Sequence, residues 1–133
     1  ITDMVRPNGL AFSVDERSLY VSDTGASHVV GGPRHIRRYD VDLGEGRVTG
    51  GGEVFATCPS GSFDGFRVDT DRRIWASGAL GVHCYDFDGT LLGTVRLPEP
   101  CSNVVFGGPQ RRTLYMTATS SLYALDVAVT GAL

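Results

Sequence analysis

The sequence contains no lysine, because all 12 basic residues among its 133 are arginine. This absence excludes a phosphate-binding P-loop, which needs a lysine on the phosphates, and any mechanism that forms a Schiff base on a lysine. With 15 acidic residues the net charge is −3, which argues against a nucleic-acid-binding surface. We therefore expect no nucleic-acid partner.

Cysteine is scarce and long apolar runs are missing. Cys58, Cys84 and Cys101 are odd in number and show no CxxC spacing, a pattern that favours buried thiols over a disulfide framework or a metal site. No apolar run approaches the roughly 18 residues of a membrane span, so we expect no membrane partner. No signal peptide is recognisable at Ile1, and we expect a cytoplasmic protein, although Met4 is the first methionine and the chain begins in mid-pattern.

Several familiar catalytic signatures are absent too. The sequence has no GxSxG nucleophile elbow, and His28, His35 and His83 have no serine or cysteine partner at a suggestive spacing. The acidic segments VDTDRR and YDFDGT look like the start of an EF-hand loop, but neither has the downstream glutamate or the flanking helices. We interpret both segments as turns.

An internal repeat is the strongest feature that the sequence does contain. Its three copies are NGLAFSVDERSLYVSD from Asn8, DGFRVDTDRRIWASG from Asp64 and NVVFGGPQRRTLYMTA from Asn103. Each copy opens with Asn or Asp, runs through a short apolar strand, turns on polar residues and re-enters an aromatic strand. A period of roughly 40 to 50 residues with several strands per unit is typical of a β-propeller.

The strand patterns predict an all-β fold, a β-propeller segment of about three four-stranded antiparallel blades. No window has helical apolar spacing. We expect one segment over residues 1–133, with blades at about 8–57, 64–98 and 103–127 and a separate strand at 1–5. The third blade shows only three strand patterns. Closed propellers pair strands from the two chain ends. We therefore expect the strand at 1–5 to pair with a blade other than the one at 8–57.

The residues that open the innermost strands are expected to converge at one mouth of the propeller channel. They are Asn8, Asp64 and Asn103, one carboxylate and two amide carbonyls. Hard oxygen donors from separate strands suit Ca²⁺ or Mg²⁺ rather than softer ions. The alternative is that Asn-Gly and Asp-Gly are turn residues, which is their commonest role. Both interpretations stay open on these residues alone.

Longer segments resemble a known family. They are RPNGLAFSVDERSLYVSDTG, HIRRYDVD, FDGFRVDTDRRIWASGALGVHCYDFDGTLLG and SNVVFGGPQRRTLYMTATSSLYAL. Together they resemble the gluconolactonase/regucalcin family of six-bladed propellers, also called the senescence-marker-protein or luciferin-regenerating-enzyme-like family. The resemblance implies a divalent-metal-dependent hydrolase of sugar lactones or related small esters. Ca²⁺ is the expected metal, with Mg²⁺, Mn²⁺ or Zn²⁺ as alternatives.

The resemblance also implies roles for individual residues. Asn8, in RPNGLAFS, corresponds to a metal ligand of the family, and Asp64, in FDGFRVD, corresponds to a ligand that is also the catalytic acid/base. The implied mechanism is that the metal polarises the lactone carbonyl while Asp64 activates water. Asn103 has no role carried over from the family, but the repeat places it as a possible channel-lining residue.

The sequence departs from the family in length. A complete member has six blades, and this chain supplies three, which the resemblance implies are its C-terminal half. Nothing in it corresponds to the family's glutamate ligand or to the substrate-contacting residues of the missing half. We therefore expect a second propeller half as a partner, either covalent in the parent protein or a second copy in a homodimer. The function is then either a lactonase or a non-catalytic propeller piece that binds a ligand or partner through its channel face.

Overall fold

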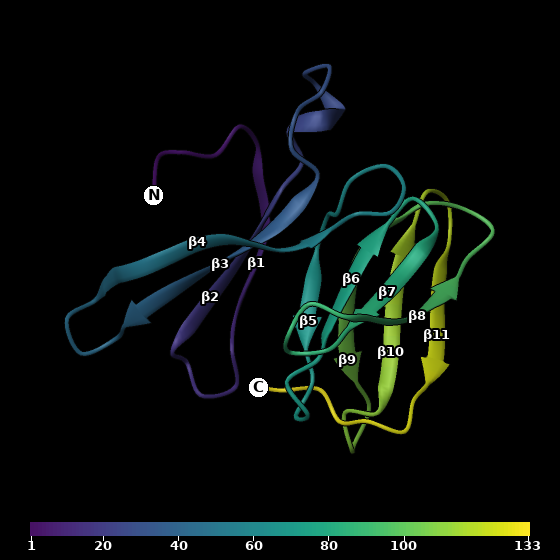
Figure 1. Ribbon diagram of the computed structural model, residues 1–133. Helices are drawn as coiled ribbons and strands as arrows, with labels where there is room; N and C mark the ends of the chain where they lie inside the picture. Colours follow the sequence, from purple (N-terminus) through teal and green to yellow (C-terminus); the bar gives the residue numbers. More distant parts are fainter.

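The computed structural model describes residues 1–133 and contains eleven strands and one short 3₁₀ turn, η1 at Gly25–Ser27. It has no helix long and apolar enough to cross a membrane. The strands form three separate antiparallel sheets that follow one another in chain order (Figure 1). The predicted all-β architecture of three blades is confirmed.

Each sheet is one blade whose neighbouring strands follow one another in the chain, and the longest connection within a blade, between β2 and β3, contains η1. Blade 1 contains β1 (Pro7–Phe12), β2 (Ser18–Asp23), β3 (His35–Asp42) and β4 (Arg47–Thr57). Blade 2 contains β5 (Phe66–Val68), β6 (Ile74–Gly78), β7 (Gly81–Tyr85) and β8 (Leu91–Arg96). Blade 3 contains β9 (Cys101–Gly107), β10 (Thr113–Ala118) and β11 (Leu122–Asp126).

The first hairpin of every blade turns in the same way. Glu16, Arg72 and Arg111 stand at the three corners with positive φ angles of 57°, 67° and 54°. Non-glycine residues seldom adopt this left-handed conformation, so its recurrence at one repeat position shows that the three copies share their backbone path as well as their residue pattern.

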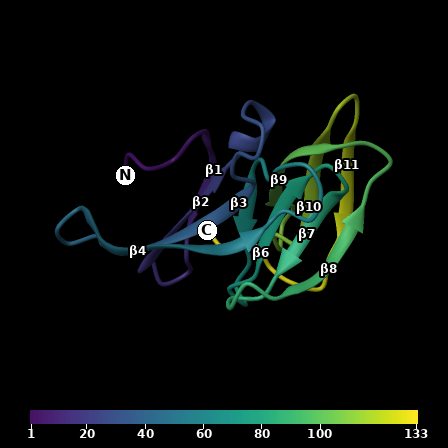
Figure 2. The ribbon, with the colours of Figure 1, turned by 45° about the horizontal axis from the view of Figure 1, so that its top comes forward.

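Blade 2 lies between blades 1 and 3 in both views of the ribbon (Figure 1, Figure 2). Two cores of buried side chains fill the two interfaces. Between blades 1 and 2, the ring of Phe55 packs edge-on against Tyr85 with centroids 6.4 Å apart. Between blades 2 and 3, Trp75 and Phe106 pack edge-on at 5.9 Å. Aromatic pairs thus join blade 2 to both of its neighbours.

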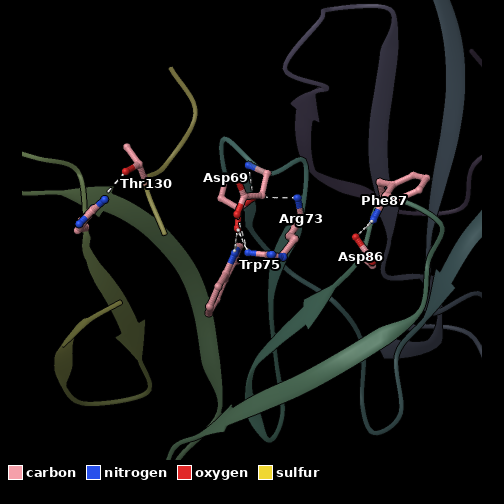
Figure 3. Close-up of polar contacts among 8 residues, drawn as sticks. Asp69, Arg73, Trp75, Asp86, Phe87 and Thr130 are labelled. Atoms are coloured by element: carbon pink, nitrogen blue, oxygen red, sulfur yellow. Dashed lines mark hydrogen bonds and ion pairs between the residues drawn. The ribbon is translucent and has the colours of Figure 1, made fainter. Parts of the chain in front are cut away.

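A buried carboxylate fixes the β5–β6 hairpin of blade 2 (Figure 3). Asp69 is fully buried and accepts hydrogen bonds at 2.9 Å from the backbone N–H groups of Asp71 and Arg73 and from Nε1 of Trp75. The Arg73 guanidinium lies 3.8 Å away. These donors replace the water that a buried charge loses. The segment VDTDRR is therefore a turn, as predicted.

Residues 1–5 form no strand in this structure, although the sequence predicted one there. Instead, the buried carboxylate of Asp23 accepts the backbone N–H groups of Val5 and Arg6, each at 2.8 Å, and Asp3 pairs with Arg37 at 2.7 Å. A strand is defined by its hydrogen-bonded neighbour, and no strand of this chain lies beside residues 1–5. Their pairing with a blade outside the chain stays a prediction.

Blade 3 has three strands, and β11 forms its outer edge. The segment after Asp126 adds no fourth strand but runs back toward blade 2 (Figure 1). There the N–H of Thr70 donates to the carbonyl of Thr130 at 2.8 Å, and the N–H of Ala132 donates to the carbonyl of Val68 at 2.9 Å. The edge of β11 is therefore left without a partner strand.

Candidate functional site

A polar pocket of about 470 Å³ opens where the first strands of the three blades begin. The strands β1, β5 and β9 lie next to one another (Figure 1), and the pocket collects residues from all three blades. Asn8 and Asp64 both line it, and no basic side chain does. The lining residues are Asn8, Thr24, Ser27, Ser62, Phe63, Asp64, Gly78, Ala79, Pro100, Cys101, Ser102, Ala118 and Thr119.

A β-bulge in blade 1 directs Asn8 into the pocket. Between the pairs Pro7–Asp23 and Leu10–Val21, the two residues Asn8 and Gly9 lie opposite the single residue Ser22. Bulges of this kind bend a strand and change the direction of its side chains, and they are frequent beside active sites.

Blades 2 and 3 repeat this two-against-one arrangement. In blade 2 the N–H of Asp64 donates to the carbonyl of Ser77 at 3.2 Å, and the N–H of Ser77 donates to the carbonyl of Gly65 at 3.0 Å. In blade 3, Ser102 is the extra residue between the pairs Thr117–Asn103 and Ala118–Cys101. The same kind of β-bulge thus directs one side chain from each blade into the pocket.

Glycine at the second bulge position lets neighbouring blades approach closely. A Cβ atom at Gly9 would collide with the backbone carbonyl of Asp64, and one at Gly65 would collide with the side-chain amide of Asn103. Across the second junction, the N–H of Gly65 donates to the carbonyl of Ser102 at 3.0 Å. The glycines are therefore needed because of the spacing between blades, and not only for a turn.

Asp64 is half-buried and forms no ion pair with a basic side chain. Burial raises the pKa of its carboxyl group above the ordinary value of 3.8, and the hydrogen-bonding Asn8 side chain opposes this rise in pKa. An ionised carboxylate that has lost part of its hydration and has no cationic partner is electrostatically suited to bind a cation.

The side chains of the pocket are of the type that binds a hard divalent cation, but they are too few to complete its coordination. Asn8 and Asp64 offer an amide carbonyl and a carboxylate, which are oxygen donors that Ca²⁺ and Mg²⁺ prefer. The structure contains no cluster of three or more His, Cys, Asp or Glu side chains that could hold a metal. The chain thus supplies two suitable oxygen-bearing side chains, whereas Ca²⁺ takes about six to eight oxygen ligands.

Asn103 does not line this pocket, although the repeat led us to expect it beside Asn8 and Asp64. Its side-chain Oδ1 accepts the N–H of Val104 at 2.9 Å. Ser102 lies in the pocket instead. The extra residue in the β9 bulge shifts the register by one position, so Ser102 corresponds to Asn8 and Asp64, while Asn103 corresponds to the glycine that follows each of them.

The strand pairs of the first hairpin in each blade show the same register. Tyr20, Trp75 and Tyr115 occupy one repeat position, and their strand partners are Ala11, Arg67 and Val105. Three residues before each partner stand Asn8, Asp64 and Ser102. The sequence alone would not have identified Ser102, because Asn8, Asp64 and Ser102 lie 12, 11 and 13 residues before their aromatic residues, and the strand pairs are known only from the structure.

The remaining nucleophile candidates are poorly suited to chemistry. All three cysteines are buried and free, as predicted. Burial raises the pKa of each thiol, in Cys84 to about 11, so that little reactive thiolate forms at neutral pH. His83 is also buried and bonds through Nδ1 to Thr94 Oγ1 at 2.9 Å. Of these four residues only Cys101 lines the pocket.

Comparison with known proteins finds that this chain is similar to lactonases and to a regucalcin. The SMP-30/gluconolactonase/LRE-like region matches residues 1–120. The pentonolactonase XacC of Haloferax volcanii is 34% identical, over 94% of this chain and 48% of that protein. A gluconolactonase from Xanthomonas campestris is similar in structure, with 36% identity and a TM-score of 0.80 over 95% of this chain and 39% of that one. The structure of a calcium-binding protein, regucalcin, from Agrobacterium tumefaciens is also similar, with 26% identity and a TM-score of 0.82 over 97% of this chain and 48% of that one.

The chain spans about half the length, or less, of the curated relatives it matches, from 30% to 48% of their chains. The solved gluconolactonase and regucalcin structures are likewise covered to 39% and 48%. These relatives therefore carry at least as much chain again outside the matched part.

Proposed function

This chain belongs to the SMP-30/gluconolactonase/LRE-like family, and we propose that it contributes half of the site of a divalent-metal-dependent lactonase acting on sugar lactones or related small esters. One observation carries the proposal: Asn8 and the half-buried Asp64 line one polar pocket that contains no basic side chain. The reaction class is supported by relatives named as a pentonolactonase, a gluconolactonase and a 6-deoxy-6-sulfogluconolactonase.

In this proposal Asn8 and Asp64 hold the cation, through an amide oxygen and a carboxylate oxygen. A divalent cation bound there would polarise the lactone carbonyl and stabilise negative charge on its oxygen. Ca²⁺ is our first choice, because the donors are hard oxygens and one structural relative is a calcium-binding regucalcin. Mg²⁺, Mn²⁺ and Zn²⁺ are the alternatives to be compared with it.

Asp64 acts as the general base in the proposed hydrolysis. It takes a proton from a water molecule as the water oxygen bonds to the lactone carbonyl carbon. When the ring C–O bond breaks, Asp64 returns the proton to the departing alkoxide, so that water and lactone become one hydroxy acid. A cation bound beside the carboxyl group would keep Asp64 ionised and therefore able to accept this proton.

The other pocket residues suit a hydroxylated substrate. Ser62, Ser102 and Thr119 line the pocket and carry hydroxyl groups, which can both donate and accept hydrogen bonds. Sugar lactones present several hydroxyl groups of their own. We assign these three side chains to substrate binding and Asp64 to the chemical step.

A second propeller half is the proposed partner of this chain. The two cation donors here are fewer than a divalent ion requires, and the exposed apolar residues Leu10 and Phe12 of β1 and the free edge of β11 are surfaces that further blades would cover. The second half is either covalent in the parent protein or a second copy of this chain.

The test is hydrolysis of gluconolactone by the assembled protein after chelator treatment, with and without each of the four cations. We expect the rate to depend on the cation, and Asp64→Asn to lower kcat about a hundredfold or more, the usual contribution of a general base. Asp71→Asn, in the exposed turn of the same blade, is the matched control and should leave kcat unchanged.

Unchanged turnover in Asp64→Asn would remove Asp64 from the mechanism. Lactone binding without turnover at any cation would favour the alternative, a non-catalytic propeller that binds a ligand through its channel face.

A further inference from the structure

We propose that Ser22 is a positioning residue that sets the spacing between Asn8 and Asp64 by joining the two bulges that carry them, an inference that rests on the proposed metal-dependent function. Ser22 lies in β2 and is completely buried. It faces the bulge of Asn8 and Gly9. It does not line the pocket, so any effect on the site must pass through the backbone.

The Ser22 hydroxyl connects blade 1 to blade 2 next to both proposed cation ligands. Its Oγ accepts the N–H of Gly9 at 2.8 Å, on the residue that follows Asn8. The same hydroxyl lies 3.1 Å from the backbone carbonyl oxygen of Asp64 and 3.3 Å from that of Gly9, to either of which it can donate its single hydrogen. One side chain therefore bridges the backbone beside Asn8 and the backbone of Asp64 itself.

The equivalent hydroxyls in the other blades make no such bridge. Ser77 Oγ donates to the carbonyl of Gly65 at 2.6 Å, and Thr117 Oγ1 donates to the carbonyl of Asn103 at 3.4 Å. Both bonds stay within their own blade and close the local bulge. All three blades thus keep a hydroxyl opposite the bulge, but only Ser22 also reaches the next blade, at the junction between Asn8 and Asp64.

The backbones of blades 1 and 2 lie so close together at this junction that the blades have little room to shift. A Cβ atom at Gly9 would collide with the Asp64 carbonyl and approach Gly65 Cα to 3.0 Å. With the backbones this close, removal of the Ser22 hydroxyl leaves the Gly9 N–H without its acceptor and leaves Asp64 without the bond that fixes its carbonyl. A buried donor without a partner is costly, so the bulge is expected to shift, and Asn8 with it.

Such a shift matters because cation ligands must be held to within about 0.5 Å. Residues that orient a ligand without touching the metal typically change metal affinity by about 10–100-fold when they are removed. Ser22 acts on the geometry of two ligands at once, so we expect an effect in this range.

The experiment is calorimetric titration of Mn²⁺ and of Ca²⁺ into the assembled protein and its variants. Ser22→Ala should weaken cation binding about tenfold or more. Ser22→Thr should restore most of the affinity, because threonine keeps the hydroxyl group that forms the bridge. Thr117→Ala removes the equivalent hydroxyl of blade 3, whose bulge carries neither proposed cation ligand, and should change affinity less than about threefold.

A second measurement needs no cation. Amide hydrogen exchange at Gly9 should speed up in Ser22→Ala and stay near the wild-type rate in Thr117→Ala, because only the first variant removes the acceptor of that N–H. If Ser22→Ala fails to fold, the pair Ser22→Val and Ser22→Thr gives the same contrast, since these two side chains have the same shape and differ in the hydroxyl group.

Three outcomes would overturn the inference. The first is equal loss of cation affinity in Ser22→Ala and Thr117→Ala while the wild type binds normally, which contradicts the inference but not the proposed function. The second is unchanged cation affinity in Ser22→Ala with accelerated amide exchange at Gly9, which would mean that the bridge has a structural role but does not affect cation binding. The third is a wild-type protein that binds no divalent cation, which removes the proposed function as well.

Discussion

Blade 2 and blade 1 are copies of one repeat, but they differ in how much of their surface is buried. All five residues of β7, the third strand of blade 2, are buried. In the equivalent strand of blade 1, β3, two residues of eight are buried. Blade 2 has a neighbour on each face, whereas blade 1 has one neighbour in this chain (Figure 2). Burial is therefore decided by what lies next to a blade rather than by the blade's own strand pattern.

The outer blades keep apolar side chains on surfaces that have no neighbour here. Leu10 and Phe12 in blade 1 are 60% and 43% exposed, and Val105 and Leu122 in blade 3 are 49% and 67% exposed. Clusters of exposed apolar residues commonly mark interaction sites. The comparison with blade 2 suggests that these residues would be covered by further blades.

The largest expected effect contrasts two phenylalanines. Phe66→Ala in blade 2, where the side chain is 0% exposed, should lower the free energy of unfolding of the 133-residue chain by about 3–5 kcal/mol. Phe12→Ala in blade 1 should cost less than about 1 kcal/mol there, because little is lost when an exposed side chain is truncated. Denaturant unfolding measures both, and similar losses would contradict the difference in packing between the blades.

The next effect concerns the first hairpin of each blade. Asp69→Ala in blade 2 should destabilise the chain by about 2–4 kcal/mol, since three N–H donors around the buried carboxylate lose their acceptor. Asp15→Ala in blade 1 is the control, because Asp15 is exposed and its bonds to Ser13 and Arg17 can be replaced by water. Thermal unfolding should show a clearly larger shift for Asp69→Ala.

The smallest effect is a dependence of stability on pH with opposite sign at two aspartates. Burial raises the pKa of Asp64, so its contribution to stability is fully present below the unfolded-state pKa and is lost as pH rises through the folded-state pKa. The hydrogen bond from Arg37 lowers the pKa of Asp3, so that contribution is present above the unfolded-state pKa and is lost as pH falls through the folded-state pKa.

Unfolding of the cation-free protein between pH 3 and pH 7 tests these signs. Asp64→Asn should be as stable as the wild type or slightly more stable at pH 7, with the difference vanishing at low pH. Asp3→Asn should be slightly less stable at pH 7. An Asp64→Asn variant that is less stable only at neutral pH would reverse the assigned sign.

Strand positions could be read from the sequence because each strand has a local cause. Short β-branched and aromatic runs separated by turn residues gave eleven of the twelve expected strands. The strand expected at residues 1–5 is absent because its neighbour would have to come from outside this chain. A strand without a partner has no hydrogen-bonded ladder to define it.

The composition of the pocket was harder to read, because it depends on bulges. The one-residue shift at Ser102 moves Asn103 out of the pocket, and a bulge inside a polar strand has no local sequence mark. Ser22 was missed for a similar reason, since its role is visible only once two blades are placed side by side. Contacts between repeats, rather than within them, set the geometry of this site.

The most direct test of the proposed cation site is a crystal structure of the assembled protein soaked with Mn²⁺, located by its anomalous scattering. The account predicts a cation bound by the side-chain oxygens of both Asn8 and Asp64, at roughly 2.0–2.6 Å, with its remaining protein ligands from the second propeller half. A fully occupied cation elsewhere, or none in the pocket at saturating Mn²⁺, would contradict it.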